Sequence, residues 1–272
     1  LAETIKLLEE NAMAVFESNG YIDNEEILSN MKRIYSKSSN YDKVIKAFEH
    51  FNNLGKDNDI AHLMVNAYFH KGKYGFCNEK WALALYYSEK ALDYYLKTGF
   101  HDTDKYIEII LQIGESYTEI EECLLFLANN YYSDAINLIA GSELEYNKLL
   151  LVKIYGRRAL NYYKIEQLKE SINDIDEGNK ILEELKFELI EEESNLWIYL
   201  NFEMAYILFK KAIFEQNIDN IITLNKCMKY LDNALEIIIS SDIKEEVYEE
   251  YGQILYLKGV ILSLQGNYGK AL

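Results

Sequence analysis

The chain has 272 residues, and its 28 lysines and arginines against 45 aspartates and glutamates give a formal net charge of −17. Duplex DNA and anionic membrane surfaces are bound largely through Lys and Arg, so this charge argues against both as partners of this segment. The chain contains no proline, where average usage would supply about 13, and this absence predicts one uniform secondary structure.

The predicted elements are helices almost throughout. Residues 1–40 are expected to form N-terminal helices that serve as a linker, a cap or part of a helical bundle. From 41 to 272, apolar residues recur at the i, i+3, i+4, i+7 spacing of one helix face, as between Tyr106 and Tyr117. Strand-like alternation is not sustained anywhere. Breaks fall at clusters of Gly, Asn, Asp and Ser, near residues 38–40, 55–59, 99–102, 141–142 and 240–242.

Small residues recur along these helices with a long period. One unit has Gly114 three residues before Tyr117 on a first helix, and Ala128 seven residues before Ala135 on a second helix. Equivalent positions lie 40, 44, 43, 56 and 44 residues apart, at Val44, Ala84, Ala128, Ser171, Cys227 and Ala271. Because antiparallel helices approach closely only where side chains are small, this period predicts helical hairpins stacked in series.

These residues resemble tetratricopeptide repeats (TPRs), best over 66–74 and 259–272. The resemblance spans about 25–272, although the usual proline at the end of each repeat is missing. It implies an all-α, right-handed superhelix, or α-solenoid, of about six TPR-like hairpins over 41–272, the last incomplete. The 40-odd-residue steps in an acidic chain rich in Tyr, Ile and Asn are also similar to the receptor domains of Gram-positive peptide-pheromone regulators, the Rap, Rgg, NprR and PlcR class.

This second resemblance implies the peptide-binding domain of a cytoplasmic, quorum-sensing-type transcriptional regulator. The segment begins at Leu1 rather than Met, so we expect a fragment without its helix-turn-helix DNA-binding domain. The implied partner is a short peptide or a protein segment. Whether the chain also forms a homodimer is not decided by the sequence. Two alternatives remain: a TPR scaffold for protein–protein interaction, and a Rap-like regulator of a response-regulator protein.

In such repeats the first helix of each hairpin lines an inner groove, which implies a set of peptide-binding residues. An extended peptide needs amides, hydroxyls, rings and charges. The implied residues are His62, Asn66, Phe69, Gln112, Glu115, Lys153, Arg157, Tyr163 and Asn201. In the fifth repeat the sequence does not fix which face of the first helix lines the groove. One register places Asn201 there, and the other places Tyr199, Phe202 and Tyr206 there. Arg157 is the expected clamp for a peptide carboxylate; alternatively, Arg157 and Arg158 pair with nearby acids.

No sequence motif indicates catalysis, a cofactor or a metal. The chain has no H-E-x-x-H motif, Gly-rich phosphate loop or nucleophile elbow. His62 and His70, eight residues apart, do not by themselves make a metal site. The three cysteines are far apart, which fits a reducing cytoplasm, and no apolar run reaches the roughly 18 residues of a membrane span. We therefore expect a non-enzymatic cytoplasmic protein.

Overall fold

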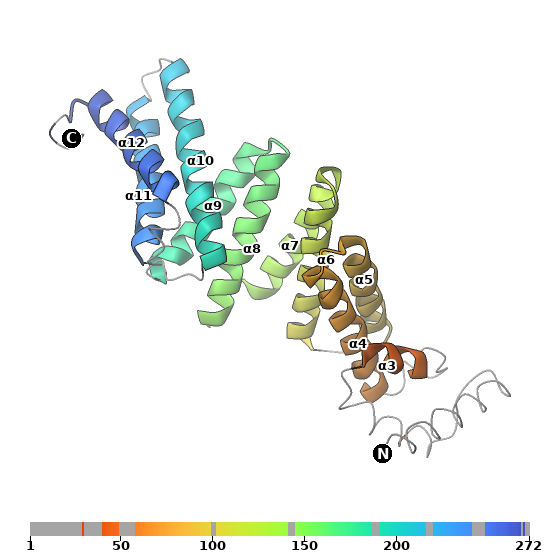
Figure 1. Cartoon of the computed structure of the whole chain (residues 1–272). Coiled ribbons are helices and arrows are strands. Elements are labelled where there is room, and N and C mark those ends of the chain that lie inside the picture. Colours follow the sequence, from red (N-terminus) through yellow and green to blue (C-terminus); the bar gives the residue numbers. More distant parts are fainter. Residues whose placement is uncertain are drawn as a thin grey trace. The chain divides into compact units, whose positions relative to one another are not determined.

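The computed structural model describes residues 29, 40–48, 58–98, 102–140, 145–185, 191–215, 220–240, 248–267 and 269. Within these ranges the regular structure is helical throughout, which confirms the all-α prediction (Figure 1). The helices predicted over 1–40 lie outside the described residues, apart from residues 29 and 40. The chain divides into two compact units, Leu1–Leu138 and Ile139–Leu272, each of which is built from consecutive helices that pack against one another.

The first unit is a run of antiparallel helices. They are α3 (Tyr41–Phe48), α4 (Asn58–Cys77), α5 (Trp81–Thr98), α6 (Thr103–Ile120), the short 3-10 helix η1 (Glu122–Leu124) and α7 (Leu125–Ile139), whose last residue belongs to the second unit. Asp102 caps α6, because its side chain accepts a hydrogen bond from the backbone N–H of Lys105 at 3.0 Å. The core combines side chains of α3, α4, α5 and α6, including the fully buried Phe48, Ile60, Met64 and Ile109.

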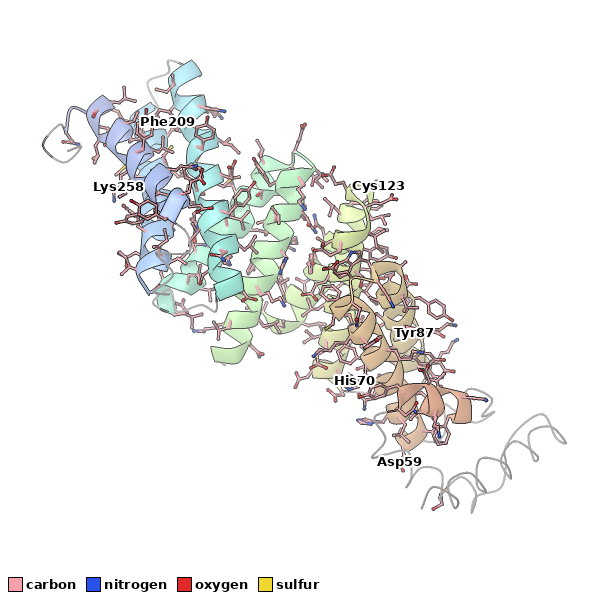
Figure 2. The ribbon with its side chains drawn as sticks, viewed as in Figure 1. Asp59, His70, Tyr87, Cys123, Phe209 and Lys258 are labelled. Atoms are coloured by element: carbon pink, nitrogen blue, oxygen red, sulfur yellow. The ribbon has the colours of Figure 1, made fainter. Side chains whose placement is uncertain are left out.

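The second unit is a further run of helices: α8 (Glu145–Lys164), α9 (Leu168–Glu184), α10 (Glu191–Glu215), α11 (Asn220–Ser240) and α12 (Tyr248–Leu264). Helix α10 contacts α8, α9, α11 and α12. Its fully buried Trp197 lies where α8 and α9 carry glycines, Gly156 and Gly178. Lys258 of α12, labelled in Figure 2, pairs with Asp232 of α11 and helps join those two helices.

The residues at the equivalent positions predicted from the sequence, small in every unit but the first, are buried. The five described equivalent positions, on α3, α5, α7, α9 and α11, are at most 2% exposed: Val44, Ala84, Ala128, Ser171 and Cys227. The sixth, Ala271, lies outside the described residues. In the hairpin of α4 and α5, a Cβ added to Gly75 would come within 2.9 Å of the backbone nitrogen of Ala84. Small side chains therefore permit this close approach of two helices.

One turn geometry recurs after α4, α8 and α12. Two residues after the end of each helix, one residue lies in the left-handed region: Glu79 (φ 55°), Glu166 (φ 60°) and Gly266 (φ 76°). The N–H of the next residue bonds back to the carbonyl five positions earlier: Lys80 to Gly75 at 2.9 Å, Gln167 to Tyr162 at 2.8 Å and Asn267 to Leu262 at 2.9 Å. This is the Schellman arrangement, which satisfies the last carbonyls of a helix and reverses the chain. Helix α6 instead leads through η1 into α7.

Candidate functional site

Helix α4 presents three of the predicted binding residues on one face. His62 is exposed, Asn66 is half-buried and Phe69 is 9% exposed. The Asn66 side-chain nitrogen lies 2.9 Å from His62 Nδ1, so the amide can donate to an unprotonated imidazole nitrogen. Positions i, i+4 and i+7 share a helix face, so the sequence spacing is enough to explain why these three side chains lie together.

Helix α6, which packs against α4, supplies the other predicted residues of the first unit. Glu115 is half-buried and Gln112 is buried. Within the described part of the chain, the Gln112 side-chain oxygen has no hydrogen-bond partner. Lys105 of α6, absent from the predicted set, holds its ammonium 4.4 Å from the centroid of the Phe69 ring and pairs with Glu108. This face therefore combines an imidazole, an amide, an aromatic ring and an ion pair.

On α8 the second of the two adjacent arginines forms an ion pair with α9. Arg158 donates two hydrogen bonds to the Asp174 carboxylate of α9, from Nε at 2.8 Å and from Nη2 at 2.7 Å. Burial raises the pKa of Asp174, and the Arg158 guanidinium opposes that shift. The predicted alternative of pairing with an acid therefore applies to Arg158. Arg157 and Lys153, the predicted peptide contacts, are half-buried on the same helix.

Tyr163, near the end of α8, meets α10. Its hydroxyl donates a 2.9 Å hydrogen bond to the Glu203 carboxylate and lies within hydrogen-bonding reach of the Tyr199 hydroxyl. Burial, and then the bond to Glu203, raise the pKa of Tyr163 to about 12. At neutral pH this hydroxyl is therefore a protonated donor that holds Glu203 in place.

The outward side of α10 is aromatic. Tyr199 and Tyr206 are 42% and 38% exposed, and the Phe202 ring is stacked 6.2 Å from that of Tyr206. Lys210 places its ammonium 4.1 Å from the centroid of the Tyr206 ring. Because these residues follow i, i+3, i+7 and i+11 spacing, they form one stripe along the helix.

Asn201 lies on the opposite side of α10 and is fully buried. Its amide exchanges two hydrogen bonds with Asn179 of α9, at 2.9 and 3.2 Å, and donates to the Trp197 carbonyl at 2.9 Å. Of the two registers that the sequence leaves open, the structure exposes Tyr199 and Tyr206, leaves Phe202 half-buried beside them and places Asn201 between helices. Glu203 was not among the predicted site residues. In the register that exposes Tyr199, its i+4 spacing from Tyr199 would place it on the same face of α10.

Among the residues that the structure describes, no three His, Cys, Asp or Glu side chains gather as metal ligands would. None of the helices in the described ranges is long and apolar enough to cross a membrane.

No protein-family model matches the chain, and no curated protein matches it in sequence. The function of this protein is therefore inferred from the chemistry of its own surfaces.

Proposed function

We propose that the chain binds a short peptide, or an extended segment of another protein, along the first helices of successive hairpins. The observation behind this proposal is the surface formed by Tyr163 of α8 with Tyr199, Phe202 and Tyr206 of α10. Two of these rings are more than a third exposed, and a carboxylate lies among them. Large rings of low conformational entropy beside hydrogen-bonding groups are typical of surfaces that bind peptides.

We further propose that the hairpins form a TPR-like, right-handed solenoid. Two features support this: the buried residues at equivalent positions of α3, α5, α7, α9 and α11, small in all but α3, and the recurrence of one turn after α4, α8 and α12. A stack of similar hairpins aligns their first helices, which favours an elongated ligand.

The proposed biological role is that of a peptide sensor, the receptor domain of a cytoplasmic quorum-sensing-type transcriptional regulator. This part rests on the resemblance in repeat length and composition. A helix-turn-helix domain encoded before Leu1 and a small secreted-peptide gene nearby would support it. A scaffold is favoured if both are missing, and copurification with a response-regulator protein would favour the Rap-like alternative.

Affinity selection tests peptide binding directly. The immobilised chain is incubated with a pool of capped random heptapeptides, and the retained peptides are sequenced by mass spectrometry. We expect a reproducible enriched set whose dissociation constants, measured by calorimetry, rise at least tenfold in Tyr199→Ala/Tyr206→Ala. The matched control is Tyr86→Ala/Phe126→Ala, because these two rings are 52% and 57% exposed on α5 and α7, the second helices of their hairpins. A pool that leaves no enriched peptide would overturn the proposal.

A further inference from the structure

The first unit already contains two sites at which a lysine is held by an aromatic ring and a carboxylate. The Lys71 ammonium lies 4.3 Å from the centroid of the Tyr87 ring, labelled in Figure 2, and pairs with Asp42. The Lys105 ammonium lies 4.4 Å from the centroid of the Phe69 ring and pairs with Glu108. Each combines attraction to the negative face of a ring with an ion pair.

The second unit also places an aromatic ring beside a carboxylate, but among the described residues no lysine lies between them. The tyrosine–glutamate cluster consists of Tyr163, Tyr199 and Glu203, and the Glu203 carboxylate accepts its hydrogen bond from the Tyr163 hydroxyl. Within the described ranges, no basic side chain pairs with Glu203. The Tyr199 ring is 42% exposed beside this carboxylate. A cation arriving from solvent would find both kinds of partner.

The neighbouring stripe on α10 shows that its rings can take a cation. Lys210 occupies the Tyr206 ring, with its ammonium 4.1 Å from the centroid. Lys210 therefore contacts the Tyr206 ring, which is nearer the end of the helix. Tyr199 lies seven residues, or almost two turns, before Tyr206 and is not the ring that Lys210 contacts. The cluster remains the part of this surface where a carboxylate and an exposed ring are available together.

We propose that this cluster binds a basic side chain of the ligand, a Lys or an Arg. The inference rests on the proposed peptide-binding function and specifies the chemistry of its ligand. The net charge of −17 favours it, because the field of an acidic protein attracts cationic peptides and repels anionic ones. A peptide carboxylate at this position would face Glu203 directly.

The test uses two capped random heptapeptide pools of equal apolar content, one with a single Lys or Arg in each peptide and the other with a single Asp or Glu. The full chain is incubated with each pool, and the affinities of retained peptides are measured by calorimetry. Glu203→Gln is the informative variant, because its amide oxygen can still accept from Tyr163 while the charge is lost. Glu236→Gln, an exposed site on α11, removes one charge from the same unit and serves as the control.

We expect the basic pool to be enriched. The Glu203→Gln variant should then bind the enriched basic peptides about tenfold more weakly, as expected for loss of a hydrogen bond to a charged group. The Glu236→Gln variant should change their affinity less than twofold. Replacing the basic residue of an enriched peptide by Met should weaken binding to the wild type similarly and make it insensitive to Glu203→Gln. Enrichment of the acidic pool, or equal effects of the two variants, would overturn the cation site and leave peptide binding standing. Retention of neither pool would overturn both.

Discussion

Gly178 of α9 offers a demanding test of the packing in the second unit. A Cβ at this position would lie 2.1 Å from Cη2 and 2.5 Å from Cζ2 of the Trp197 ring. Ordinary carbon–carbon contacts are about 3.5–4.0 Å, so a rigid indole would have to move by more than 1 Å. The ring is fully buried, and Gly156 of α8 is packed against its other edge.

The expected size of the effect comes from two opposing contributions. Replacing Gly by Ala within a helix gains about 1 kcal/mol in helix propensity. Overpacking a well-filled core costs about 1–3 kcal/mol, and the two short distances place Gly178→Ala at the upper end of that range. The net prediction is a loss of about 2 kcal/mol in the free energy of unfolding of this unit.

The assay is urea unfolding followed by far-UV circular dichroism. Gly252→Ala on α12 is the matched control, because nothing lies within 4 Å of its added Cβ. It should stabilise the chain by about 0.5–1 kcal/mol. In a Trp197→Leu background the clash is gone, so Gly178→Ala should lose its penalty. Stability of Gly178→Ala equal to the wild type, or a penalty that persists without the indole, would refute the reasoning.

Three further predictions concern a turn, a histidine and a thiol. Glu166→Gly should raise the unfolding free energy by about 0.5–1 kcal/mol in urea titrations, because glycine adopts the positive φ of this turn without strain; no gain would contradict the turn assignment. Burial, with Lys105 and Lys73 nearby, lowers the pKa of His70 from 6.5, so the stability that neutral His70 contributes is present above pH 6.5 and lost as pH falls through the lowered value. The melting temperature should therefore fall less between pH 7.5 and 5 in His70→Gln than in the wild type, and equal slopes would refute this. Burial raises the pKa of Cys227 to about 11, so mass spectrometry after maleimide labelling at pH 7.5 should find the two exposed cysteines modified quickly and Cys227 only on unfolding.

The helical class and the hairpin contacts could be predicted from the sequence because both depend on local periodicity. Helical spacing is visible in any window of four turns, and a small residue every 40-odd positions indicates where two helices approach. Ala84, Ala128 and Cys227 are fully buried for this reason. The turns at Glu79 and Glu166 could not be predicted from the sequence, because glutamate rarely adopts a positive φ.

The candidate site was only partly visible in the sequence. His62, Asn66 and Phe69 share a face by spacing alone, whereas the exposed face of α10 depended on which side Trp197 occupies between α8 and α9. A helix that is apolar around most of its circumference has no preferred inward side until its neighbours are placed. The sequence by itself thus determined helices, their small contact residues and an acidic surface. Tertiary packing alone decided that Asn201 is buried, that Tyr199 is exposed and that Glu203 is half-buried against Tyr163.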